Sequence, residues 1–167
     1  ELPFLTMVGL RAVPGSAAAE RLQNRLGTPL PTGCGAVTSS DGAHVLWLSP
    51  DEFLVISSEP ADELTVGLVE DLQGDPGSAT DLSANRTTFV LQGPSARPVL
   101  EKGCPLDLHP RAFAPGTAYL TLIGKVPVIV WKVADQEFRI LPRSSFADFL
   151  GRWLLDAMAE FQAPELP

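Results

Sequence analysis

The sequence predicts an α+β fold made of two similar halves, each a split βαβ unit of the ferredoxin-like kind. Three observations support this class. Apolar residues make up 45% of the 167 residues and charged residues 19%, which is enough apolar material for a core. Short apolar runs alternate with breaks rich in Gly and Pro. A hairpin followed by a helix occurs twice, over residues 45–72 and 130–161.

The first half begins with an apolar run over residues 3–13, which ends at Pro14-Gly15 and is typical of a strand closed by a turn. Ser16 is a suitable N-cap for a helix over residues 17–26, and Gly27 supplies the stop. Residues 28–41 are rich in Pro, Gly, Thr and Ser, and we expect a long loop there.

A hairpin and a second helix complete this half. The apolar runs at residues 45–48 and 53–57 flank a four-residue turn that contains Pro50. A helix over residues 61–72 follows, because Pro60 lies near its first position and three leucines recur at a spacing of four. Residues 74–77 end it, and Asp81-Leu82-Ser83 is expected to be a short extended piece.

The second half is expected to repeat this plan. A β-branched run over residues 87–91 predicts a strand, and the break at Gly93-Pro94 precedes a helix over residues 95–102. An irregular segment follows at residues 103–116. Three further strands and a final helix, starting in a capping box at residues 145–148, are then expected. The strands are residues 118–123, 126–131 and 137–141.

The repeated order β-α-β-β-α sets the expected domain organisation. We assign residues 1–83 to an N-terminal lobe and residues 84–167 to a C-terminal lobe. A single half covers only one face of its sheet with helices, so we expect the two lobes to pack together as one compact domain.

Composition excludes several classes of function. The formal net charge is −8 and Lys and Arg form no cluster, which argues against nucleic acid or an anionic membrane as a partner. No run approaches the roughly 20 consecutive apolar residues that a bilayer span requires. The N-terminal residues lack a basic stretch of the signal-peptide kind, so we expect a cytoplasmic protein.

The search for chemistry yields no catalytic residue, no cofactor-binding residue and no metal ligand. There is no G-x-G-x-x-G motif after the first strand and no P-loop. The two histidines and two cysteines form no C-x-x-C or H-x-x-x-H pair. Cys104 with His109 is the one candidate for an activated thiol, but its apolar neighbours favour a buried structural cysteine.

Four polar residues are candidates for contact with a partner or ligand. Asp107, His109 and Arg111 alternate along the irregular segment, which would point them to one side if the chain is extended there. The alternative is that His109 bonds a backbone carbonyl or Asp107, and that Arg111 forms a local ion pair that shapes the loop. Arg86 has the same two interpretations.

Two sets of motifs resemble known families. Asp81-Leu82-Ser83, Phe89-Val90-Leu91-Gln92-Gly93-Pro94-Ser95-Ala96 and Ala114-Pro115-Gly116-Thr117 resemble the folate-binding domain of aminomethyltransferase (glycine-cleavage T-protein) relatives. A second set resembles the sarcosine oxidase gamma subunit more closely: residues 102–113, Lys125-Val126-Pro127-Val128 and residues 143–150. The likeness is strongest over residues 81–161.

This resemblance implies a T-protein-like fold and membership in a complex with alpha, beta and delta subunits. Such a complex oxidises sarcosine to glycine with formation of hydrogen peroxide, and yields formaldehyde or 5,10-methylenetetrahydrofolate. The resemblance places FAD, FMN, NAD and tetrahydrofolate on the alpha and beta subunits and zinc on the delta subunit. It implies no cofactor on the gamma chain.

Two alternatives remain open from the sequence. One is a free-standing folate-binding module of the T-protein type, although the chain has about half the expected length and only Asp107 lies near the family's folate-contacting acidic position. The other is a thiol enzyme built on Cys104.

Overall fold

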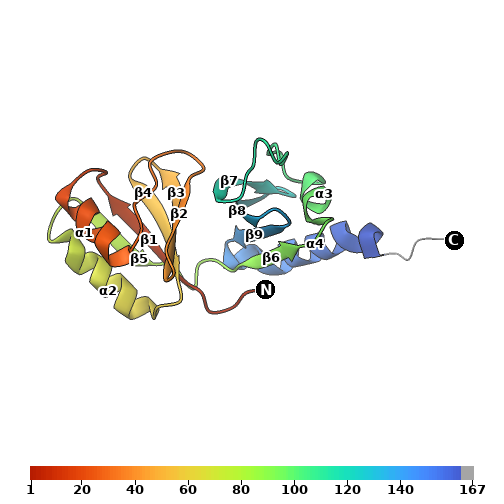
Figure 1. The fold of residues 1–167 in the computed structure, drawn as a ribbon. Coiled ribbons are helices and arrows are strands. Elements are labelled where there is room, and N and C mark those ends of the chain that lie inside the picture. Colours follow the sequence, from red (N-terminus) through yellow and green to blue (C-terminus); the bar gives the residue numbers. More distant parts are fainter. Residues whose placement is uncertain (163–167) are drawn as a thin grey trace. The chain divides into compact units, whose positions relative to one another are not determined.

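The computed structural model describes residues 1–162 and divides the chain into two compact units (Figure 1). The N-terminal unit is Pro3–Arg86, and the C-terminal unit combines Glu1–Leu2 with the chain from Thr87 onward. Each unit holds one antiparallel sheet with helices, so the expected α+β class is confirmed. The packing of two lobes into one domain stays a prediction.

The N-terminal unit is a five-stranded sheet with two helices. Its sheet order is β2-β3-β4-β1-β5, with antiparallel pairing throughout. The elements are β1 Thr6–Ala12, α1 Ala17–Leu26, β2 Val37–Ser39, β3 Ala43–Ser49, β4 Glu52–Ser57, α2 Ala61–Leu72 and β5 Gly77–Asp81.

Local chemistry fixes the ends of α1 as the sequence predicts. The Ser16 hydroxyl accepts a hydrogen bond from the Ala19 N–H at 3.1 Å, and Gly27 ends the helix in the left-handed conformation with φ 66°. Leu22 of α1 and Leu68 of α2 are fully buried against the sheet residues Val8 and Val55. The two helices therefore cover one face of this sheet.

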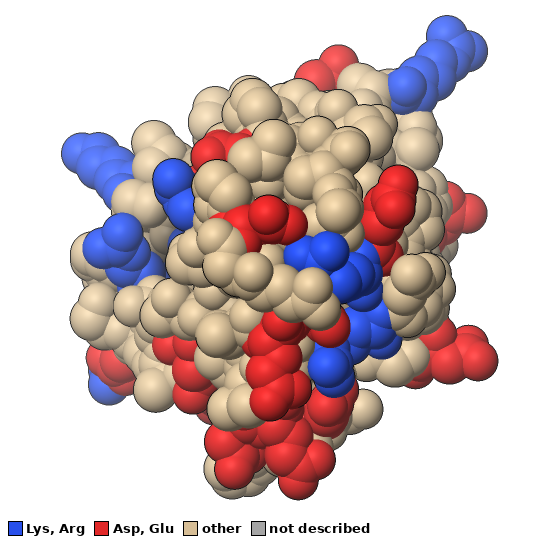
Figure 2. Space-filling model, turned by 90° about the vertical axis from the view of Figure 1, so that its left-hand side faces the viewer, with Lys and Arg blue, Asp and Glu red and all other residues tan. Residues whose placement is uncertain are grey.

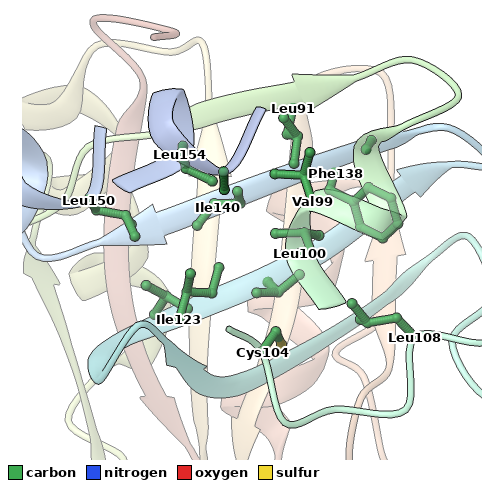
Figure 3. Close-up of a cluster of buried hydrophobic side chains, with 14 of the residues drawn as sticks. Leu91, Val99, Leu100, Cys104, Leu108, Ile123, Phe138, Ile140, Leu150 and Leu154 are labelled. Carbon is green, nitrogen blue, oxygen red and sulfur yellow. The ribbon is translucent and has the colours of Figure 1, made fainter. Parts of the chain in front are cut away.

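The C-terminal unit is a four-stranded antiparallel sheet with order β6-β9-β8-β7. Its elements are β6 Phe89–Gln92, α3 Ala96–Glu101, β7 Thr117–Ile123, β8 Val126–Ala134, β9 Glu137–Pro142, the 3₁₀ turn η1 Ser144–Phe146 and α4 Ala147–Gln162. Its core joins Leu100 of α3, Ile123 of β7, Ile140 of β9 and Leu150 of α4 (Figure 3). Leu150, Leu154 and Ala157 of the final helix are buried in this core. Phe149 and Phe161 on the same helix are exposed, so only part of its apolar face serves the core.

Three details differ from expectation. Residues 28–41 are not entirely loop, because Val37–Ser39 pairs with β3 as an edge strand. The extended piece expected at residues 81–83 is the end of a longer strand, Gly77–Asp81, which pairs with β1 and begins at the last residue of the expected helix stop. The final helix is preceded by η1, a 3₁₀ turn over residues where a capping box was expected.

Candidate functional site

The candidates Asp107, His109 and Arg111 lie in the loop between α3 and β7 and are all exposed. The Asp107 carboxylate accepts a hydrogen bond from the His109 N–H at 2.9 Å. The His109 ring nitrogen Nδ1 accepts one from the Arg111 N–H at 3.2 Å, and the His109 carbonyl accepts two more from Ala112 and Phe113. These bonds fold the segment into consecutive turns.

The conditional prediction that this stretch is extended is therefore wrong, and the three side chains do not follow a strand alternation. The alternative, in which His109 fixes the loop, agrees with the geometry, although the ring accepts from a backbone N–H and does not donate to a carbonyl. Contact of Asp107, His109 and Arg111 with a partner stays a prediction. Arg86, half-buried after a turn, belongs to the N-terminal unit, so no single unit gathers all four candidates.

Cys104 is buried in the core of the C-terminal unit, among Leu100, Leu108 and Ile123 (Figure 3). Its Sγ lies 4.0 Å from the Thr121 hydroxyl oxygen, and no hydrogen bond within residues 1–162 joins it to His109. A buried thiol without a base is a packing group, as its apolar neighbours in the sequence indicate.

Lys132 is a buried cation that the sequence analysis did not single out. Its side chain is only 2% exposed, and its Nζ donates to the Phe113 carbonyl at 3.0 Å. The same nitrogen lies 5.8 Å from the centroid of the Phe138 ring. Lys132 lies on the same side of β8 as the buried residues Val128 and Val130, because side chains alternate along a strand. This alternation is the sequence signal that could have placed the Lys132 side chain in the core. Lys132 anchors the end of the loop that carries His109.

The motif Asp81-Leu82-Ser83 links two strands of the N-terminal unit. The Ser83 hydroxyl accepts from the Met7 N–H at 3.0 Å and donates to Asp81 Oδ1 at 2.6 Å. The Ser83 N–H donates to the same oxygen at 2.9 Å. These two bonds stabilise the carboxylate and lower the pKa of Asp81 below its usual value of 3.8. The motif is a structural connection between β5 and β1.

A partly apolar groove of about 590 Å³ lies between β6 and α4 of the C-terminal unit, and we call it the β6–α4 groove. Figure 1 shows β6 beside α4. Val90 and Leu155 at the groove are 38% and 62% exposed, respectively. Its lining residues are Glu1, Phe89, Val90, Leu91, Gln92, Gly151, Leu154, Leu155 and Met158. Such a surface fits a contact with another chain better than it fits catalysis.

Charge is divided unequally between the two units. Residues 3–86 contain eleven Asp and Glu against four Arg, a formal charge of −7. Residues 1–2 and 87–162 contain eight acidic and eight basic residues, a formal charge of zero. On the face that Figure 2 shows, acidic side chains gather in the lower part beside a smaller basic group. The negative field of the chain therefore comes from its N-terminal unit.

Neither a cluster of metal-binding side chains nor a membrane-spanning helix occurs among the described residues. Within residues 1–162, no three His, Cys, Asp or Glu side chains group closely enough to hold a metal ion. None of the helices in that range is long and apolar enough to cross a bilayer.

Comparisons with known proteins agree with the resemblance seen in the motifs. Residues 9–160 match the model of the sarcosine oxidase, gamma subunit family. The chain is 49% identical over 162 residues to the sarcosine oxidase subunit gamma of Corynebacterium sp. (strain P-1), covering 96% of this chain and 79% of the relative. It is 48% identical over 165 residues to the Arthrobacter sp. subunit gamma, covering 98% and 81%.

Solved structures give the same result. A chain of the heterotetrameric sarcosine oxidase from Corynebacterium sp. U-96 superimposes with a TM-score of 0.93 at 45% identity, covering all of this chain and 86% of that one. Aminomethyltransferase T from Bartonella henselae matches with a TM-score of 0.65 at 17% identity over 90% of this chain and 43% of that one, which supports the T-protein-like fold alone. The resemblance predicted from the motifs is confirmed, and the chain belongs to the sarcosine oxidase gamma subunit family.

Proposed function

We propose that this chain is the gamma subunit of a heterotetrameric sarcosine oxidase and that its role is to support assembly of the complex. The similarity to subunit gamma chains over nearly the whole length carries this proposal. The partners are the alpha, beta and delta subunits. The complex is an oxidoreductase that demethylates sarcosine to glycine, with hydrogen peroxide and either formaldehyde or 5,10-methylenetetrahydrofolate as further products, and we place it in the cytoplasm.

The proposal assigns the chemistry to the partner subunits. FAD, FMN, NAD, tetrahydrofolate and zinc belong to them, and this chain contributes binding surface. The chain's own reactive groups support this division, because Cys104 is buried without a base and Lys132 is held by a backbone carbonyl. The sequence also lacks the glycine-rich turn that cradles a dinucleotide pyrophosphate.

Subunit omission tests the proposal. The four subunits are co-expressed with and without this chain, and the complex is isolated through a tag on the beta subunit. We expect the complex of the remaining three subunits to be recovered in lower yield, and to unfold at a lower temperature, than the complex of all four. The remaining complex should keep the same rate of flavin reduction per active site, because this chain touches no reacting atom. A three-subunit complex with unchanged yield, stability and turnover would contradict the assembly role.

A folate titration of the isolated chain is the matching control. Isothermal calorimetry with tetrahydrofolate should give no binding heat for this chain, whereas the complete complex should give a heat. A saturable heat from the isolated chain would replace the assembly role with a folate-binding function.

A further inference from the structure

We propose that the β6–α4 groove receives an extended segment of a partner subunit, which adds a strand to the edge of the C-terminal sheet. This inference rests on the proposed function, because it takes the partner to be another subunit of the oxidase. It goes beyond that function by naming the surface and the form of the segment that binds there.

The first step concerns the free edge of the sheet. Strand β6 is the outermost strand in the order β6-β9-β8-β7. At the two ends of the β6–β9 pair, the Thr87 N–H donates to the Pro142 carbonyl at 3.3 Å and the Gly93 N–H donates to the Gln136 carbonyl at 2.9 Å. Because bonded residues alternate in an antiparallel pair, Phe89 and Leu91 face β9. The main-chain groups of Val90 and Gln92 therefore point away from β9.

The second step is that the outer side of this edge already accepts one main-chain hydrogen bond, at Thr88 directly before β6. The Thr88 carbonyl accepts a hydrogen bond from the Leu2 N–H at 2.8 Å. Glu1 lines the groove next to this bond, and its carboxylate accepts from the Thr87 hydroxyl at 2.6 Å. The outer edge of β6 thus bonds a main chain at Thr88, and the same edge continues past Val90 to Gln92. An extended segment is the form of ligand that such an edge binds.

The third step concerns the side chains that the segment would present. The floor and wall of the groove are Phe89, Leu154, Leu155 and Met158, so alternate residues of the segment should be apolar. Glu1 is the one charged side chain that lines the groove, and the C-terminal unit has a formal charge of zero. The matching segment is therefore an apolar strand without acidic residues, with a Lys or Arg facing Glu1.

Two variants separate main-chain pairing from groove packing. Val90→Pro removes an outward N–H while leaving the β6–β9 bonds, since proline is tolerated on an edge when its nitrogen faces outward. Leu155→Glu places a charge in the groove at a side chain that is 62% exposed.

Each variant has a matched control. Strand β7 is the opposite edge of the sheet, and the tight turn at Gly124-Lys125 makes Ile123 and Val126 a hydrogen-bonded pair. Because bonded residues alternate along β7, the main-chain groups of Leu120 point away from β8. Leu120→Pro, at a side chain that is 56% exposed, is then the control for Val90→Pro. Val66→Glu, on α2 at 57% exposure, is the control for Leu155→Glu.

The experiment is co-expression of each tagged variant with the alpha, beta and delta subunits, followed by affinity isolation and quantification of the partners. Far-UV circular dichroism and thermal unfolding of the isolated variants show whether each one folds. We expect Val90→Pro and Leu155→Glu to recover at least tenfold less partner protein than the wild type, and both controls to recover wild-type amounts. If Val90→Pro fails to fold, Leu155→Glu carries the test.

Three outcomes overturn the proposal. Full partner recovery by a folded Leu155→Glu variant would show that partners dock elsewhere, while the assembly role stands. Loss of recovery in the controls as well would show that no single edge is responsible. The third outcome is that the wild-type chain forms a homodimer, that Val90→Pro breaks this homodimer, and that the variant still recovers its partners. The groove would then bind a second copy of this chain. Recovery of no partner by the wild type would reject the assembly role itself.

Discussion

Ser83 connects two strands through one hydroxyl group, since it accepts from the backbone of β1 and donates to Asp81 at the end of β5. The Asp81 carboxylate holds the serine by two bonds to one oxygen. The connection therefore depends on the ionised form of an exposed aspartate, and it is sensitive to pH.

Replacing Asp81 by Asn should lower thermal stability slightly at neutral pH. The folded pKa of Asp81 is lowered, so its contribution is complete above the unfolded value of about 3.9 and is lost as the pH falls through the folded pKa. The stability gap between wild type and Asp81→Asn should thus be constant from pH 7 to 5 and close in more acidic solution. The effect stays under about 1 kcal/mol because water screens the exposed carboxylate.

Thermal unfolding followed by circular dichroism between pH 7 and 3 measures this gap. Ser83→Ala is the control, because it removes the hydroxyl donor and should raise the Asp81 pKa toward its usual value, as read by NMR titration. An unchanged Asp81 pKa in Ser83→Ala would show that the hydroxyl bond is not the cause of the shift.

Single residues were predictable where apolar neighbours or local capping chemistry decided their place. Ser16 and Gly27 were assigned to the ends of α1, and Cys104 to the core, because near neighbours in the sequence fix those roles. Lys132 was missed because charge favours solvent, and its inward position depends on the Phe113 carbonyl, which is 19 residues away. The turns at His109 were missed because two of their bonds join a side chain to a backbone N–H two residues away, whereas the alternation of polar residues resembles a strand.

At the scale of elements, the loop between α3 and β7 is fastened at its end by Lys132. Replacing this lysine with Met keeps an unbranched side chain that is one heavy atom shorter, and removes the donor to the Phe113 carbonyl. We expect a loss of about 1 to 3 kcal/mol, the usual penalty for leaving a buried polar group without its partner. Urea unfolding gives the free energy, and amide exchange of residues near Phe113 should become faster.

Lys125→Met is the matched control, since Lys125 is exposed in the turn between β7 and β8 and its replacement should change stability by less than about 0.5 kcal/mol. If Lys132→Met proves as stable as the wild type or more so, the cost of burying the ammonium group equals or exceeds the value of its bond.

The helices and most strands were predicted from the sequence, whereas β2 and most of β5, the two edge strands of the N-terminal sheet, were not. The bounds of α1 and α2 agree with the expected 17–26 and 61–72, because each has a periodic apolar face and a stop signal. Strands β2 and β5 carry mostly small or polar residues. Both lie at the edges of their sheet, so each is a strand because of the neighbour with which it pairs. For β5 this neighbour is β1, which is distant in the sequence.

At the scale of the whole molecule, each sheet has apolar residues on both faces. In the N-terminal unit, Val8 and Val55 face the helices, whereas Met7, Leu46 and Leu54 occupy the alternate positions, on the face that the helices of this unit do not cover. A fragment of residues 3–86 should therefore aggregate when expressed alone, because each apolar side chain left in water costs about 1.5 to 3 kcal/mol.

Light scattering and the cooperativity of thermal unfolding, compared with the full chain, measure this outcome. A monomeric fragment that unfolds cooperatively near the melting temperature of the full chain would show that the second face needs no cover.

The outer edge of β6 at Val90 and Gln92 has a consequence for the colloidal behaviour of an unassembled copy. An open edge beside an apolar groove favours association between identical chains. A net charge of −8, concentrated in residues 3–86, opposes that association by mutual repulsion between molecules. Since added salt shortens the range of this repulsion to about 8 Å at physiological ionic strength, dilute buffer should keep surplus subunits dispersed. In the cell, balanced synthesis of the partner chains would serve the same end.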